Sequence, residues 1–223
     1  MRVQPITVSP WQANCYVVVP FEGAEECLIV DPGVTAAGPV REALALLGAT
    51  PVALLATHGH FDHIGDAHLL AAEYGIPLHL AAADQHLITR PGDGLGAQGS
   101  ALMRQLTGSE VAPGIDDVRD HDGVVELAGV RIEPFAAPGH TAGSTLLTIS
   151  RDDLSVTFTG DVLFAGTIGR TDLPGGSMAA MRESLRRIAQ FFPADRALLP
   201  GHGEPTTLAA ELATNPFLQP YSL

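Results

Sequence analysis

The sequence is marked by an absence: it contains no lysine, and all 12 of its basic side chains are arginine. Set against 25 acidic side chains, they leave a formal net charge of −13 with histidine neutral. Nucleic acid is therefore disfavoured as a partner, because binding to its phosphates needs clustered basic side chains. Recognition of any small anion has to use arginine, backbone N–H groups or a metal ion.

Long hydrophobic runs are also missing, and we expect no leader peptide. No stretch approaches the roughly 20 apolar residues of a membrane span, and the first residues lack the basic start and apolar run of a signal peptide. The two cysteines, Cys15 and Cys27, lie in apolar strand-like runs, so we expect buried, reduced thiols rather than a disulfide. These absences predict a cytoplasmic protein without a membrane partner, and they leave the oligomeric state open.

The order of the apolar runs predicts an α/β protein. Short runs rich in branched or aromatic residues predict strands at residues 15–19, 27–30, 52–56 and 154–158. Helical segments follow at residues 36–47, 64–74 and 178–192, the last with Ser177 as its N-cap. Two sheets packed on each other with helices outside satisfy this order.

The least regular stretch covers residues 90–123, where glycines surround one short helical candidate at residues 101–106. A long glycine-rich excursion inside a compact domain is either a mobile surface loop or part of a substrate mouth. The sequence leaves both interpretations open.

Three of the nine histidines fall within six residues, His58-Gly59-His60-Phe61-Asp62-His63. The cluster follows a buried apolar run and precedes a helical segment, so its side chains sit where a loop can direct them inward. Alternation lets His58 and His60 point one way while Asp62 and His63 approach from the turn. Imidazole and carboxylate ligands together suit zinc, iron or manganese.

Three further turns have the same character, because each carries a histidine or aspartate beside glycine after an apolar stretch. They are Pro138-Gly139-His140, Gly160-Asp161 and Pro200-Gly201-His202-Gly203. The candidate metal ligands are therefore His58, His60, Asp62, His63, His140, Asp161 and His202. Seven ligands are more than one four-coordinate ion can use, so we expect two divalent ions, zinc first and iron or manganese as alternatives.

The other four histidines lie outside these motifs, and we expect structural roles for them. They are His68, His79, His86 and His121. Asp66, on the helical segment after the cluster, is a weaker candidate for supporting a ligand from behind.

These motifs resemble the metallo-β-lactamase superfamily over most of the chain. The similarity rests on Val30-Asp31-Pro32-Gly33, on the cluster within residues 57–65, on residues 137–144, on Thr159-Gly160-Asp161 and on residues 200–203. The resemblance implies a single domain over residues 1–223. Its fold would be a four-layer αβ/βα sandwich, in which two mixed β-sheets are flanked by helices and the metals lie at one edge of both sheets.

Within the superfamily the chain looks most like glyoxalase II, the hydroxyacylglutathione hydrolases, and especially their short single-domain members. Residues 164–172 and Asn215-Pro216-Phe217 carry that likeness. The resemblance implies that one metal is held by His58, His60 and His140, and the other by Asp62, His63 and His202. Asp161 would bridge both ions.

The sequence departs from the glyoxalase II pattern near the thiol site. Arg170 stands in place of the family's lysine, as in the shorter relatives and the persulfide dioxygenases, and Asp172 replaces a tyrosine. We expect Arg170 either to bind a substrate carboxylate or to form a pair that stabilises its loop.

The function implied is hydrolysis of a small anionic thioester, such as S-lactoylglutathione or a related acyl-thiol, by a metal-bridging hydroxide. Asp62 and His60 are the residues we expect to be catalytic, Asp62 by orienting the water or accepting its proton. The main alternative is a mononuclear iron persulfide dioxygenase that uses His58, His140 and Asp161. A lactonase is the third hypothesis. A β-lactamase is disfavoured, because the best-known zinc β-lactamases have cysteine at the position of Asp161, and the acidic charge disfavours a nuclease.

Overall fold

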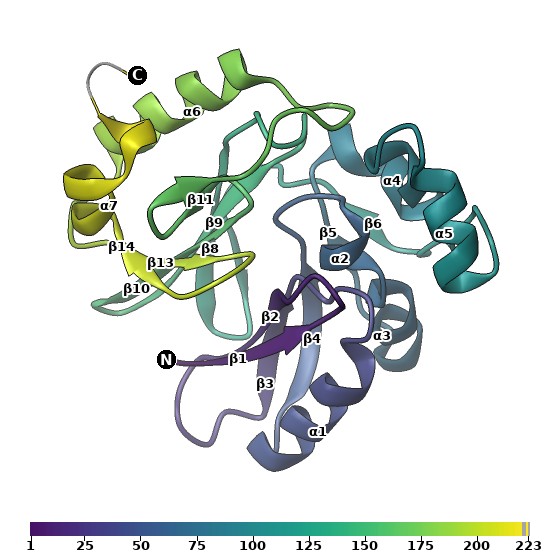
Figure 1. Cartoon of the computed structure of the whole chain (residues 1–223). Coiled ribbons are helices and arrows are strands. Elements are labelled where there is room, and N and C mark those ends of the chain that lie inside the picture. Colours follow the sequence, from purple (N-terminus) through teal and green to yellow (C-terminus); the bar gives the residue numbers. More distant parts are fainter. Residues whose placement is uncertain (220–221, 223) are drawn as a thin grey trace.

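Two six-stranded β-sheets form the centre of the fold (Figure 1). The computed structural model describes residues 1–219 and 222, the side chain of Ser100 excepted. The first sheet has the order β1-β2-β3-β4-β5-β6, antiparallel from β1 to β3 and parallel from β3 to β6. Its strands are β1 (Arg2–Val8), β2 (Ala13–Val19), β3 (Glu26–Val30), β4 (Thr50–Leu55), β5 (Leu78–His79) and β6 (Val118–Arg119).

The second sheet has the order β14-β13-β10-β9-β8-β7, in which only the β10–β13 pair is parallel. Its strands are β7 (Val125–Leu127), β8 (Val130–Ala136), β9 (Thr145–Arg151), β10 (Leu154–Gly160), β13 (Ala197–Pro200) and β14 (Thr206–Thr207). A small antiparallel ribbon, β11 (Leu163–Phe164) and β12 (Thr167–Ile168), follows β10.

Helices cover the outer faces of the two sheets (Figure 1). The first sheet is covered by α1 (Ala37–Leu47) and α3 (Ala67–Tyr74), and the second by α6 (Met178–Phe191) and α7 (Leu208–Thr214). Shorter helices lie in the connections: α2 (Phe61–Ile64), α4 (His86–Thr89), α5 (Gly99–Thr107), η1 (Ala82–Asp84), η2 (Pro91–Gly94) and η3 (Pro216–Leu218). The predicted four-layer sandwich of two mixed sheets flanked by helices is therefore confirmed.

Three apolar cores separate these four layers. Along β2 the side chains alternate, so that Cys15 and Val17 face the helices α1 and α3 while Tyr16 and Val18 face the second sheet. The middle core is closed from the other side by Phe158 of β10, whose ring lies edge-on to Tyr16 at a centroid distance of 5.1 Å. A third core lies between the second sheet and α6. Strands with two buried faces explain why their sequences are almost continuously apolar.

Most predicted elements are found where the sequence indicated. The four predicted strands fall within or beside β2, β3, β4 and β10, and Ser177 caps α6 by accepting a hydrogen bond from the backbone N–H of Ala180. Both cysteines are buried and free, as predicted. Among the described residues, no helix combines the length and apolar character needed to cross a bilayer. The single domain over the whole chain stays a prediction.

The predicted helix at residues 64–74 is wrong in its boundaries. The chain forms α2 first, already from Phe61, and then α3, with Gly65 and Asp66 between them. The break occurs because Asp66 is drawn away from the helix: its N–H donates to the Pro32 carbonyl, and its carboxylate accepts from the Ala37 N–H at the start of α1. Asp66 therefore caps α1, and the prediction that it supports a metal ligand is not met by these contacts.

Backbone hydrogen bonds join the two halves of the sandwich at the edge where the candidate ligands lie. The Asn14 N–H donates to the Gly201 carbonyl (2.7 Å), and the Thr145 N–H donates to the Thr57 carbonyl (2.9 Å). The Asn14 side chain adds a hydrogen bond to the Pro200 carbonyl (3.1 Å). Loops from both sheets are thereby held in fixed positions relative to each other.

Replacing Phe158 by alanine tests the middle core. Its side chain is fully buried between the sheets, so Phe158→Ala should lower the free energy of unfolding by about 3–5 kcal/mol. Phe191→Ala is the matched control, because Phe191 is 64% exposed and its loss should change stability by less than about 0.5 kcal/mol. Urea denaturation measures both, and equal effects would contradict the assignment of this core.

Candidate metal centre

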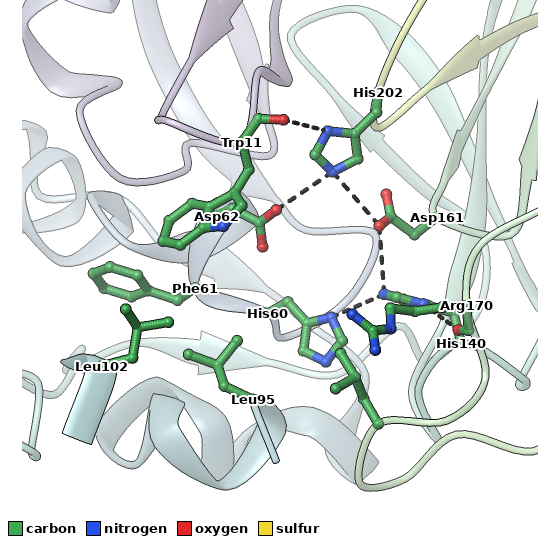
Figure 2. A pocket seen from close by; sticks show the side chains of 11 residues that line it. Trp11, His60, Phe61, Asp62, Leu95, Leu102, His140, Asp161, Arg170 and His202 are labelled. Carbon is green, nitrogen blue, oxygen red and sulfur yellow. Dashed lines mark hydrogen bonds and ion pairs between the residues drawn. The ribbon is translucent and has the colours of Figure 1, made fainter. Parts of the chain in front are cut away.

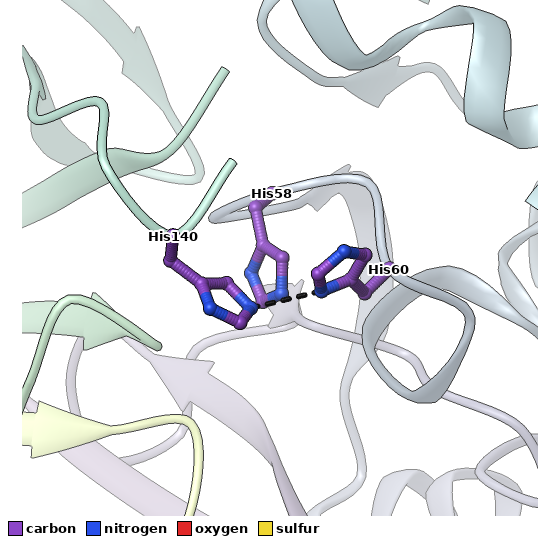
Figure 3. Close-up of side chains that lie close together, drawn as sticks. All are labelled: His58, His60 and His140. Carbon is purple, nitrogen blue, oxygen red and sulfur yellow. Dashed lines mark hydrogen bonds between the residues drawn. The ribbon is translucent and has the colours of Figure 1, made fainter. Parts of the chain in front are cut away.

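His58, His60 and His140 form the first of three overlapping groups of potential ligands in the described part of the chain (Figure 3). His58 and His60 lie in the loop after β4, and His140 lies in the loop between β8 and β9. All three side chains are buried, and His140 Nε2 lies 2.8 Å from His60 Nδ1. The predicted alternation is present, because His58 and His60 turn toward the same point.

Asp62, His63 and His202 form the second set. The short helix α2 carries Asp62 and His63 in its single turn, and His202 directly follows β13. The Nε2 atoms of His63 and His202 are 3.3 Å apart, and Asp62 Oδ2 lies 3.3 Å from His202 Nε2. Segments almost 140 residues apart in the chain thus supply one set of ligand atoms.

Asp161, at the end of β10, lies between the two sets (Figure 2). Its Oδ2 is 3.4 Å from His140 Nε2, and its Oδ1 is 3.4 Å from His63 Nε2. Glycine is required beside it, because a Cβ at Gly201 would overlap both the Asp161 carboxylate and the His63 ring. The structure therefore brings together all seven predicted ligands, and Asp161 forms a third group with His58 and His63, one from each of the two sets. That Asp161 bridges two ions stays a prediction.

In four of the histidines, Nδ1 forms a hydrogen bond with a neighbouring residue that is not itself a candidate ligand. In each case Nδ1–H is placed to donate a hydrogen bond, so Nε2 is the ring nitrogen left for a metal ion. Such partners orient the imidazoles of metal sites. The acceptors are Asp31 for His63 (3.1 Å), the Arg170 carbonyl for His140 (2.7 Å), the Trp11 carbonyl for His202 (3.1 Å) and the Thr57 hydroxyl for His58 (3.1 Å).

Three buried polar atoms of the cluster, His58 Nε2, His60 Nε2 and Asp161 Oδ1, have no hydrogen-bond partner among the described residues. Such atoms are costly to bury unless something binds them. Burial lowers the pKa of His58 well below its usual value and the pKa of His60 to about 3, so both imidazoles keep their lone pairs. The residues therefore fit divalent metal ions, and their donor types suit zinc, iron or manganese.

The carboxylates give the centre a field that favours positive charge. Burial alone would lower the pKa of His63, but Asp62, Asp161 and Asp31 outweigh it and raise that pKa to about 10. For Asp62, burial acts to raise the pKa, yet the neighbouring His63 and His202 hold it well below its usual range. The same field that stabilises a proton on His63 attracts a metal cation.

Asp31 has a supporting role that its motif alone did not define. It sits at the end of β3 in the left-handed region, with φ at 52°, which is strained for a residue other than glycine. Its carboxylate accepts hydrogen bonds from the Thr57 N–H (2.7 Å), the Thr57 hydroxyl (2.8 Å) and His63 Nδ1. Asp31 thereby fixes both the start of the ligand loop and one ligand ring.

Asp84 is a buried carboxylate that sequence reasoning missed. It accepts hydrogen bonds from the Gly59 N–H (2.9 Å), the Thr141 hydroxyl (2.7 Å) and the Gly143 N–H (2.8 Å). These donors flank His58, His60 and His140, so one side chain joins the two loops of the first ligand set. No sequence signal marks it, because an isolated aspartate after a short strand is common and its partners lie far along the chain.

A cavity of about 380 Å³ opens beside the ligands. It is lined by Trp11, His60, Phe61, Asp62, Leu95, Leu102, His140, Asp161, Arg170, Leu173 and His202. Leu95 and Leu102 come from the glycine-rich stretch of residues 90–123, which places part of that stretch in the mouth of the site. Arg170 forms a bidentate ion pair with Asp172, at 2.7 and 2.8 Å, and it also lines the cavity, so binding of a substrate carboxylate stays a prediction.

The remaining histidines lie outside the centre, in keeping with the structural roles expected for them. His68 Nδ1 donates to the Gly65 carbonyl, and His121 Nε2 donates to the Ala56 carbonyl. His79 is buried beside His121, and His86 is exposed. None of the four belongs to a group of potential ligands within the described residues.

The chain belongs to the metallo-β-lactamase superfamily, whose sequence model matches residues 8–202. Among curated relatives, the probable metallo-hydrolase YqgX of Bacillus subtilis is 34% identical over the full length of both chains. The hydroxyacylglutathione hydrolase GloC of Haemophilus influenzae is 29% identical over 98% of both.

Solved structures show the same architecture. The B3 metallo-β-lactamase BLEG-1 superposes with a TM-score of 0.82 and 31% identity, over 98% of this chain and all of the other. The di-iron-bound form of TTHA1623 gives 0.78 and 32%, over 96% of this chain and all of the other. The metal-binding superfamily predicted from the motifs is thus confirmed, and the glyoxalase II-like subgroup stays a prediction.

Asp84→Asn tests whether the link between the two ligand loops supports metal binding. Losing this charged acceptor should weaken zinc affinity by roughly 10- to 100-fold, the usual effect of removing a partner behind metal ligands. Competition with a chromogenic chelator measures the affinity. The control is Asp93→Asn, an exposed carboxylate of η2 paired with Arg90, and equal affinities of the two variants would refute the role of Asp84.

Proposed function

We propose that this protein hydrolyses small acyl thioesters with the help of two divalent metal ions. The observation that carries the proposal is the position of Asp161 between two ligand sets, in the lining of a cavity large enough for a small substrate. His58, His60 and His140 would hold one ion, and Asp62, His63 and His202 the other. Bound divalent cations would supply a nucleophilic hydroxide near neutral pH and stabilise the oxyanion of the reacting carbonyl.

Asp62 would orient the attacking water or accept its proton. Its carboxylate lines the cavity and remains 18% exposed, while its low pKa keeps it ionised and able to accept a hydrogen bond. In the overall reaction a C–O bond forms, the C–S bond breaks, and a proton reaches the departing sulfur. His60 acts beside it by completing the first ligand set.

The relatives support hydrolysis without defining the substrate. GloC is named as a hydroxyacylglutathione hydrolase and YqgX as a probable metallo-hydrolase, and both match nearly the whole chain. The di-iron form of TTHA1623 supports iron as an alternative to zinc. We expect cytoplasmic location and no nucleic-acid partner from the charge and the sequence alone.

The second ligand set favours a hydrolase over the mononuclear iron alternative. A persulfide dioxygenase would need only His58, His140 and Asp161 to hold its iron. The second ligand set would then bind no metal ion. A second candidate reaction is opening of a β-lactam ring, which the likeness to BLEG-1 favours. Assays with a thioester, a cephalosporin and a persulfide separate the three, the last by oxygen uptake.

His60→Ala tests the proposed function. Removing one ligand from the first set should reduce thioester hydrolysis by roughly a thousandfold or more, because the transition state loses electrostatic stabilisation, and should lower the bound metal. Thiol release and elemental analysis measure the two effects. The control is His86→Ala, which removes an exposed histidine and should change neither hydrolysis nor bound metal. Full turnover by His60→Ala would contradict the proposed role of His60 in hydrolysis.

A further inference from the structure

The cavity beside the metal ligands has two unlike sides (Figure 2). Leu173 also lines the cavity. On one side lie the ligand side chains and Arg170. On the other lie four apolar side chains, which we call the apolar wall: Trp11, Phe61, Leu95 and Leu102. They come from four separate segments, namely the loop between β1 and β2, α2, the residue after η2, and α5.

Three side chains of the apolar wall are accessible at the cavity, whereas Phe61 is almost fully buried. Trp11 is 39% exposed and Phe61 is 5% exposed, while Leu95 and Leu102 are half-buried. An apolar surface of this kind, next to a few convergent polar groups, is the usual composition of a small-molecule site. An apolar substituent that covers it leaves water, which is the main favourable contribution to its binding.

Among the described residues that line it, the cavity offers no unpaired arginine to an anionic substrate. Arg170 is the only arginine that lines it within residues 1–219, and the bidentate pair with Asp172 neutralises its charge. A substrate carboxylate that displaced Asp172 would only exchange one ion pair for another, and it would leave the Asp172 charge close by. Recognition of a charged thiol at this position therefore gains little.

We infer that the preferred substrates are thioesters carrying an uncharged apolar group, of the size of a phenyl ring, next to the reacting bond. This inference rests on the proposed thioester hydrolysis and adds its specificity: the group lies on the apolar wall, and an anionic thiol is not selected. The sequence predicts a small anionic thioester; the inference replaces recognition of its charge by recognition of an apolar group.

A series of thioesters tests the specificity of the metal-loaded protein. The first four substrates are the S-acetyl and S-phenylacetyl esters of N-acetylcysteamine and of glutathione, which vary the acyl group and the charge of the thiol independently. A second pair, S-benzyl thioacetate and S-ethyl thioacetate, tests a ring on the sulfur side of the reacting bond. Burial of a phenyl ring should raise kcat/KM by about tenfold or more on the side that faces the wall. The glutathione and N-acetylcysteamine esters of one acyl group should differ by less than about threefold.

Two leucines of α5 provide matched variants. Leu102 faces the cavity, whereas Leu106, on the same helix, is 44% exposed and does not line it. Leu102→Ala should reduce the ratio of kcat/KM for the ring-bearing ester to that for its small counterpart by about fivefold or more, since several buried methyl contacts are lost. Leu106→Ala should leave both rates and their ratio unchanged.

Binding without turnover gives an independent readout. Thioether analogues, in which a methylene group replaces the reacting carbonyl, cannot be hydrolysed, and calorimetry compares a phenyl-bearing analogue with an ethyl one. The phenyl compound should bind about tenfold more tightly and with a more negative heat-capacity change, the mark of apolar burial. Leu102→Ala should reduce this difference.

Asp172→Asn tests the neutralised arginine. Freeing Arg170 should raise the preference for glutathione esters over N-acetylcysteamine esters by about threefold or more, because a lone guanidinium attracts a carboxylate. A wild-type preference for glutathione esters that disappears in Arg170→Ala would overturn the inference in favour of anion recognition.

The outcomes separate the inference from the proposed function. Hydrolysis of all the esters at similar rates, with Leu102→Ala behaving like Leu106→Ala, would overturn the inference and leave thioester hydrolysis standing. Hydrolysis of none of them by the metal-loaded protein would overturn the proposed function, and the inferred specificity with it.

Discussion

Five imidazoles and two carboxylates packed together, mostly out of water, are the constraint on which the rest of this structure depends. Such groups are unfavourable to bury unless their lone pairs are bound, and here His58 Nε2 and Asp161 Oδ1 find no partner in the described part of the chain. Burial keeps His58 and His60 neutral, while three carboxylates favour positive charge near His63. Divalent cations satisfy both requirements at once, so the fold can be understood as a frame for holding them.

The frame works because the ligands come from both halves of the sandwich. The loop after β4 and the helix α2 belong to the first half, whereas His140, Asp161 and His202 follow strands of the second. Hydrogen bonds between Asn14 and Gly201, and between Thr145 and Thr57, hold the halves in register at this edge. Metal binding should therefore stabilise the docking of the two sheets as well as the local loops.

The seven candidate ligands could be selected from the sequence because their chemistry is local, and the structure brings their side chains together. A dense histidine cluster and glycine-bearing turns after buried strands identify His58, His140 and Asp161 without knowledge of the fold. The helix break at Gly65 and Asp66 was missed, because it arises from contacts with Pro32 and with α1.

Features that depend on distant contacts could not be predicted. Asp84 gains its role only when Gly59 and Thr141 fold against it, and the apolar wall assembles from four separate segments. For Arg170 the sequence left two partners open, and the structure shows the pair with Asp172. Pattern thus reveals the reactive centre, while the surfaces that select a substrate require the fold.

Metal stoichiometry tests the binuclear centre most directly. The measurement is titration of the metal-free protein with zinc, and separately with ferrous iron without oxygen, followed by elemental analysis after gel filtration. We expect binding to saturate at two ions per chain, because Asp161 lies between two ligand sets. Saturation at one ion, or no retained metal, would contradict a binuclear centre.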